Sequence, residues 1–172
     1  SMGGVVALEI ALCHTQRIRG LILINTFSAL RPGSLSEVVY FLKRGLRAYI
    51  ASPAKQAELV AQRIFPNPIH AEWREMLVQT IRESDPNVYR QAMVALARFN
   101  ANDKLSKINI PTMVITGDED STIPPKVQGR MAKKIPGSVQ YLVHGANHGV
   151  IVDHYQEVNQ LLIDFLERIY PS

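Results

Sequence analysis

Three short segments of the chain carry side chains that could act together in nucleophilic catalysis. The chain opens with Ser-Met-Gly-Gly at residues 1–4, Asp120 follows an apolar stretch that ends in Gly117, and His148 lies within residues 145–149. A serine hydroxyl is a weak nucleophile until a neighbouring base takes its proton, and a histidine oriented by a carboxylate is a common base. The sequence therefore offers one residue of each type, provided that the fold brings the segments together.

The composition is that of an ordinary folded domain. Of the 172 residues, 47% are hydrophobic and 20% are charged, and this length is enough for one domain with a core. The 19 Lys and Arg exceed the 15 Asp and Glu by a formal charge of +4, but the basic residues are scattered among acidic ones. Without a basic face or a reading motif, we expect no nucleic-acid partner.

The sequence also bears on location. No apolar run approaches the roughly 18 residues of a membrane span, and the chain does not start with a basic-then-apolar leader. The single cysteine, Cys13, follows Ala11 and Leu12, so we expect a buried, reduced side chain. These features predict a cytoplasmic protein without a membrane span.

Apolar runs and helical patterns alternate at both ends of the chain. Continuous apolar runs without polar alternation are typical of parallel strands that are covered on both faces. The expected order is a helix at 4–13, a strand at 20–25, a strand at 112–116, a helix at 126–135, a strand at 139–143 and a helix at 155–170. This order predicts an α/β fold with a mostly parallel sheet and helices on both faces.

Residues 31–104 have a different character and predict a helical insertion of three or four helices. Apolar residues recur there at helical spacing, as in Val38, Leu42, Leu46 and Tyr49. Prolines at 53, 66, 68 and 86 mark helix starts or stops. We therefore expect a core built from 1–30 and 105–172, interrupted by this insertion.

The three chemistry-bearing segments resemble those of the α/β-hydrolases. Residues 1–4 are similar to the second half of the Gly-x-Ser-x-Gly nucleophile elbow, where small residues allow a sharp strand-to-helix turn. Residues 110–124 are similar to the acid-bearing segment, in which the acid is the third residue after the glycine, and residues 145–149 are similar to the histidine loop. The chain is identified on this basis as the C-terminal portion of such a hydrolase, with residues 31–104 at the place of the lid.

The resemblance implies a role for each residue. Ser1 would be the nucleophile, Asp120 the acid and His148 the base, in the chain order of this family. It further implies that the backbone N–H of Met2 contributes to the oxyanion hole and that Gly3 and Gly4 are the elbow glycines. The implied activity is cleavage of a carboxylic ester, lactone or thioester through an acyl-enzyme, acting on a small acyl substrate without a metal or other cofactor.

Alternatives remain at each position. Ser1 could be the remnant of a cleaved tag, Asp118 could be the acid, and His154 could be the base. A zinc site built from His144, His148 and His154 would lack a fourth ligand. The histidine loop also departs from the family pattern, because Asn147 stands where glycine is commoner.

The resemblance also sets an expectation for the chain as given. A complete member carries about five strands and the second oxyanion donor before the serine, so we expect a truncated, poorly active portion. The strand at 20–25 would then have an open apolar edge that favours self-association or pairing with the missing half. The alternatives are a relative with other chemistry, such as an acyltransferase, a carbon–carbon hydrolase or a perhydrolase, and a non-catalytic fragment that assembles through this edge.

Overall fold

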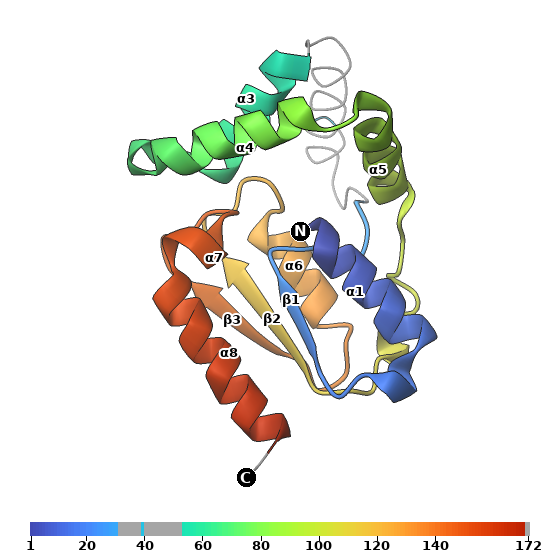
Figure 1. Ribbon diagram of the computed structural model, residues 1–172. Coiled ribbons are helices and arrows are strands. Elements are labelled where there is room, and N and C mark those ends of the chain that lie inside the picture. The colour runs from blue at the N-terminus through green and yellow to red at the C-terminus, as the bar shows by residue number, and fades with distance from the viewer. Residues whose placement is uncertain (31–38, 40–52, 171–172) are drawn as a thin grey trace. The chain divides into compact units, whose positions relative to one another are not determined.

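The computed structural model describes residues 1–30, 39 and 53–170, which belong to two compact units. The first unit combines residues 1–29 with 99–172, and the second comprises residues 30–98 (Figure 1). The helical positions expected at Val38, Leu42, Leu46 and Tyr49 lie outside the described residues.

A three-stranded parallel sheet forms the centre of the first unit. Its strands are β1 (Leu21–Ile24), β2 (Thr112–Gly117) and β3 (Val139–Val143), in the order β1-β2-β3. The register pairs Leu23 with Val114 and Ile115 with Tyr141. The predicted parallel sheet is thus confirmed, and the carboxyl ends of all three strands meet at one edge of the sheet.

Helices cover both faces of this sheet, as predicted. On one face, α1 (Met2–Cys13) and α6 (Pro125–Ala132) pack against alternate strand residues. On the other face lie α7 (Val150–Asp153) and α8 (Tyr155–Ile169), and Figure 1 shows α1 and α8 on either side of the strands. Successive residues of β2 point to opposite faces of the sheet, and β2 is buried along its whole length, so Val114 contributes to one core and Met113 and Ile115 contribute to the other. The first core also contains Leu8, Leu23 and Met131, and the second also contains Val143, Val158 and Phe165.

The expectation for Cys13 was wrong. Cys13 is exposed at the last position of α1, and its thiol lies 3.6 Å from Oε1 of Glu9, one turn earlier. Apolar and small residues occupy nearly the whole surface of α1, with Glu9 as its one charged residue, so the apolar neighbours of Cys13 do not indicate which side of the helix it occupies. Leu8 and Ala11, in contrast, are fully buried.

Two short 3-10 turns and an isolated antiparallel bridge complete the described part of the first unit. The turns are Thr15–Arg17 and Leu105–Lys107. Residues 99–104, which the composition grouped with the helical insertion, lie in this unit, where Ala101 is buried and its N–H donates to the Ser28 carbonyl at 2.8 Å. The chain therefore leaves and re-enters the first unit side by side, at the bridge between Ala29 and Asn100.

The second unit, as far as it is described, is helical. It contains α3 (Pro53–Ile64), the 3-10 turn Pro68–His70, α4 (Ala71–Glu83) and α5 (Pro86–Arg98). The prolines were expected to mark helix starts or stops, and α5 begins at Pro86. Asp85 caps α5 by accepting bonds from the N–H groups of Asn87 and Val88 at 2.7 and 3.1 Å.

The helices in the described part of the chain are short. The longest helix in the described ranges, α8, has 15 residues. None of the described helices combines the length and the apolar character that crossing a bilayer requires. The expected cytoplasmic location stays a prediction.

Substitution of two glycines of the first unit by alanine should change the free energy of unfolding in opposite directions. A Cβ on Gly117 would lie 2.6 Å from the Asn147 carbonyl oxygen, so Gly117→Ala should lower the free energy of unfolding by roughly 1–3 kcal/mol. A Cβ on Gly129, within α6, would meet only the Gln140 side chain at 3.5 Å among the described residues, so Gly129→Ala should raise it by about 0.5–1 kcal/mol. Denaturant unfolding of both variants measures the difference, and an unchanged midpoint for Gly117→Ala would contradict this packing.

Candidate functional site

Asp120 is a buried carboxylate that accepts hydrogen bonds from four donors. It follows the end of β2, and its Oδ1 accepts from the N–H groups of Thr122 and Ile123 at 2.8 and 2.9 Å. Its Oδ2 lies 2.8 Å from Nδ1 of His148 and 3.2 Å from Nε2 of Gln128. The residue is only 2% exposed, so this carboxylate has a fixed direction.

His148 lies on the loop between β3 and α7, with its side chain 7% exposed. A carboxylate oxygen only accepts, so Nδ1 of His148 carries the hydrogen of this bond. In the neutral ring Nε2 is then left with its lone pair. This arrangement suits a general base that is oriented by an acid.

Ser1 and His148 line one cavity of about 250 Å³ in the first unit. The cavity lies beside β1 and the start of α1, and its lining residues are Ser1, Gly3, Gly4, Ala7, Ile22, Ile24, Asn25, His148 and Ile151. The Ser1 carbonyl accepts a bond of 2.6 Å from the hydroxyl of the buried Thr26. The structure thus brings the expected nucleophile and base to the same cavity and pairs the base with the expected acid.

The residues after Ser1 form a close-packed helix start. Met2 is the first residue of α1, and the N–H groups of a first helical turn have no acceptor within the helix. A Cβ on Gly4 would lie 2.6 Å from Cβ of Thr26, so this position requires glycine, whereas a Cβ on Gly3 would have no described atom within 4 Å. Gly4 therefore permits the close approach of α1 to the segment after β1.

Asn25 was missed by the sequence analysis. It directly follows β1, is 2% exposed and has a positive φ of 44°. Its Nδ2 donates to the carbonyls of Asn147 and His148, both at 2.9 Å, and its Oδ1 accepts from the N–H of Gly117 at 2.9 Å. Asparagine tolerates positive φ, and an asparagine after a buried strand was the one available signal.

The three C-terminal histidines pair with three different carboxylates. His148 pairs with Asp120, whereas His154 lies 3.0 Å from Asp153 and His144 lies 2.7 Å from Asp118. No group of three or more possible metal ligands occurs within residues 1–30, 39 and 53–170. The zinc arrangement therefore receives no support from the described residues.

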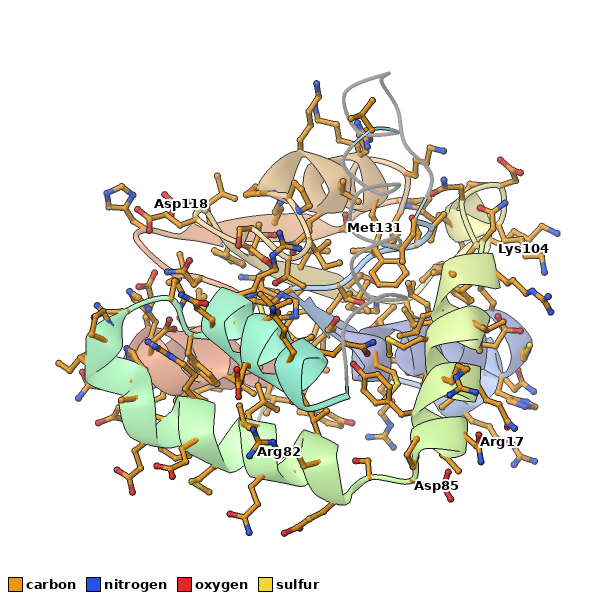
Figure 2. The ribbon with its side chains drawn as sticks, turned by 90° about the horizontal axis from the view of Figure 1, so that it is seen from above. Arg17, Arg82, Asp85, Lys104, Asp118 and Met131 are labelled. Atoms are coloured by element: carbon orange, nitrogen blue, oxygen red, sulfur yellow. The ribbon has the colours of Figure 1, made fainter. Side chains whose placement is uncertain are left out.

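Asp118 binds the histidine loop at the surface of the first unit. Its Oδ1 accepts from the Gly145 N–H at 2.7 Å and its Oδ2 contacts His144, and Figure 2 shows Asp118 at the outer edge of the fold. The hydrogen bond to His144 lowers the pKa of Asp118, and the same bond raises the pKa of His144. Asp118 is thus a brace for the loop rather than the partner of His148.

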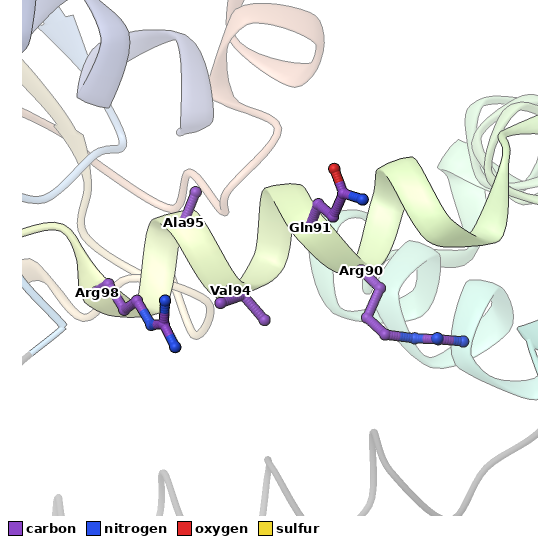
Figure 3. Close-up of a pocket in the computed structure, with 5 residues that line it drawn as sticks. All are labelled: Arg90, Gln91, Val94, Ala95 and Arg98. Carbon is purple, nitrogen blue, oxygen red and sulfur yellow. The ribbon is translucent and has the colours of Figure 1, made fainter.

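A second hollow lies within the helical unit, along α5. It has a volume of about 340 Å³ and is lined by Arg90, Gln91, Val94, Ala95 and Arg98. Figure 3 shows Arg90, Val94 and Arg98 projecting from one side of this helix. None of these side chains is a nucleophile beside a base, so the cavity that holds Ser1 and His148 is the candidate active site.

Known proteins share both the sequence pattern and the fold. A pimeloyl-(acyl-carrier protein) methyl ester esterase of Neisseria meningitidis is 25% identical over 175 residues, covering 98% of this chain and 56% of the relative. A thermophilic esterase from Thermogutta terrifontis is 28% identical with a TM-score of 0.77, covering 98% and 63% of the two chains. The enol-lactonase from Burkholderia xenovorans LB400 has a TM-score of 0.81 at 21% identity, covering 96% and 63%.

The parallel sheet, its helices and these neighbours define the class as α/β-hydrolase, which confirms the predicted resemblance. The profile of the family described as serine aminopeptidase, S33, matches residues 1–154, and the chain belongs to this family. The chain spans 56% of the length of the Neisseria relative and 63% of the Thermogutta structure.

The Asp118–His144 pair predicts a pH-dependent brace. Because the pair raises the pKa of His144, it contributes to the stability of the fold. This stability is fully present below pH 6.5, the usual pKa of histidine, and is lost as the pH rises through the pKa of His144 in the folded protein. The lowered pKa of Asp118 likewise contributes stability. This part is present above pH 3.8, the usual pKa of aspartate, and is lost as the pH falls through the pKa of Asp118 in the folded protein. The contribution is therefore largest between these two usual values.

Thermal unfolding of His144→Gln against the unchanged protein checks this prediction. The difference in Tm should be small, because His144 is exposed, and larger at pH 5.5 than at pH 9. Asp118→Asn should show the same trend. A difference that is equal at both pH values would mean that the pair does not act through its charges.

Proposed function

We propose that the protein is a serine hydrolase that cleaves a carboxylic ester, lactone or thioester through an acyl-enzyme. The proposal rests on one observation: the buried His148–Asp120 hydrogen bond of 2.8 Å, with His148 and Ser1 lining the same cavity. Family membership and the similarity to a methyl ester esterase support this choice of chemistry. Ser1 is then a native nucleophile and not a tag remnant.

In the proposed mechanism, Nε2 of His148 takes the proton from Ser1 Oγ as this oxygen attacks the acyl carbonyl. Asp120 holds the ring through Nδ1 and stabilises the imidazolium that forms. The imidazolium next gives its proton to the leaving alcohol or thiol, which leaves the acyl group on Ser1. Water, activated by the same base, then hydrolyses the acyl-enzyme.

The negative oxygen of the tetrahedral intermediate needs fixed donors. We propose the N–H of Met2 as one donor, since it belongs to the first turn of α1 and follows the nucleophile directly. Gly4 supports this position by letting α1 pack on Thr26. A second donor, as the family resemblance implies, would come from a loop outside these 172 residues.

We further propose that the helical unit acts as a lid that selects the substrate. Its sequence stands between β1 and β2, where the resemblance places the lid. Several of its large apolar side chains are exposed, namely Leu59, Ile69, Trp73, Met76, Val88, Met93 and Val94. Apolar side chains in such numbers suit contact with an acyl chain.

Association through the sheet edge stays a prediction as well. In the described sheet β1 is an edge strand, and Met2, Val6 and Ile10 of α1 are 45–54% exposed. An unpaired edge beside apolar side chains favours pairing with another strand. We propose such pairing for a polypeptide of these 172 residues alone, either with its own copy or with the rest of the protein.

Substitution of the two candidate bases tests the proposed chemistry. In the full-length protein, His148→Ala should lower kcat towards an activated ester on the order of 10⁴-fold or more, because no other group takes the serine proton. His154→Ala is the matched control and should change it little, since His154 pairs with Asp153. Loss of activity in His154→Ala with retention in His148→Ala would overturn the assignment.

Exchange of the helical unit tests the lid. Replacing residues 30–98 with the corresponding segment of another family member should change the preferred acyl-chain length, because the apolar contacts would differ. Hydrolysis of a small acetate ester should remain measurable, since Ser1, Asp120 and His148 lie outside the exchanged segment. Rates of hydrolysis across a series of ester chain lengths give the measurement, and an unchanged preference would argue against a lid.

A further inference from the structure

Gln128 of α6 is a fully buried amide directed at the acid of the candidate site. It is 0% exposed, and its Nε2 lies 3.2 Å from Oδ2 of Asp120 and 2.9 Å from the Ile123 carbonyl. We propose that Gln128 is a positioning residue that orients and partly neutralises the Asp120 carboxylate. This inference rests on the proposed function, in which Asp120 acts through His148.

The neighbours of Gln128 fix the orientation of its amide. The Asp120 carboxylate and the Ile123 carbonyl only accept hydrogen bonds, so the NH₂ group must face them. On the other side, the Thr116 hydroxyl donates to Oε1 of Gln128 at 3.0 Å. Nε2 also lies 3.4 Å from Oδ1 of Asn25, and a flipped amide would oppose oxygen to oxygen at all three acceptors, so the donor towards Asp120 is held in place.

The bond from Gln128 reaches the same oxygen that orients the base. Oδ1 of Asp120 is held by two backbone N–H groups, while Oδ2 receives Nδ1 of His148 at 2.8 Å and Nε2 of Gln128. A second donor fixes the plane of the carboxylate and directs one lone pair of Oδ2 at the imidazole. It also disperses negative charge, which weakens the hold of Asp120 on a protonated His148.

An amide is suited to this role because it carries no charge of its own. A carboxyl at position 128 would compete with Asp120 for a proton, and a cation would compete with His148 for the carboxylate. The other titratable side chains on the two adjoining loops are Asp118, Glu119 and His144, and Asp118 is occupied with His144. These groups are common to all the variants compared below, so differences among the variants report on position 128.

The first experiment replaces Gln128 by methionine, which has a similar length and shape but no donor. In the full-length protein we expect kcat to fall about tenfold, with KM little changed, because one charge-assisted bond to the acid is lost. The midpoint of the acidic limb of kcat/KM should move upward by roughly half a pH unit, since the carboxylate keeps more of its charge. The ¹H NMR resonance of the proton between His148 and Asp120 should shift.

Gln140→Met is the matched control. Nε2 of Gln140 donates to the Thr116 hydroxyl at 3.0 Å and not to Asp120, so all three readouts should stay close to those of the unchanged protein. Gln128→Met with unaltered kcat, acidic limb and proton resonance, whatever its Tm, would overturn the proposal. Full activity in both Asp120→Asn and His148→Ala would instead overturn the proposed function.

Gln128→Glu covers the case in which the methionine variant does not fold. Two carboxyl groups about 3 Å apart do not both ionise readily, so the new group keeps a proton at low pH and donates it to Asp120 in place of the amide. As the pH rises and this proton is lost, the donor disappears. The ratio of variant to unchanged kcat/KM should therefore fall with rising pH, and a ratio that is constant would overturn the proposal.

Discussion

The buried amide of Asn25 is the interaction on which the candidate site depends. One side chain joins three segments, because it binds the N–H of Gly117 at the end of β2 and the carbonyls of Asn147 and His148 in the loop after β3. Backbone groups that are removed from water at the end of a sheet must find partners, and each one left unpaired costs about 1–3 kcal/mol. The loop that carries His148 is thus tied to the strand that leads to Asp120.

Close approach between backbones makes this tie possible. The Gly117 position leaves no room for a side chain beside the Ala146 and Asn147 carbonyls, and Gly4 leaves none beside Thr26. Both glycines stand where a strand end or helix start meets a neighbouring loop. The carboxyl edge of a parallel sheet gathers such loops at one place, which is why residues far apart in the chain converge on the cavity that holds Ser1.

Much of the framework could be predicted because burial leaves a direct record in the sequence. The strand expected at 139–143 was found with these bounds, and Pro86 begins a helix, as was expected of a proline that marks a helix start or stop. The partners of Asn25 could not be predicted, because they lie 92 to 123 residues away and depend on the strand register. Those of Gln128, such as Asp120 and Ile123, are near in sequence, but the path of the loop after β2 decides whether they meet the amide. The prediction that Cys13 is buried was wrong for a related reason, because composition does not tell which side of an apolar helix faces a neighbouring element.

The two aspartates of the loop after β2 show how environment separates residues of one type. Asp118 and Asp120 each contact a histidine at a similar distance, 2.7 and 2.8 Å. The His144 side chain is 99% exposed, so water competes for its bond and screens its charge, whereas the Asp120 side chain is fully buried and that of His148 is 7% exposed. Only the buried pair keeps a fixed geometry in a medium of low polarity, where a carboxylate can stabilise an imidazolium strongly. Burial rather than residue type therefore favours Asp120 as the acid and leaves Asp118 as the brace of the loop.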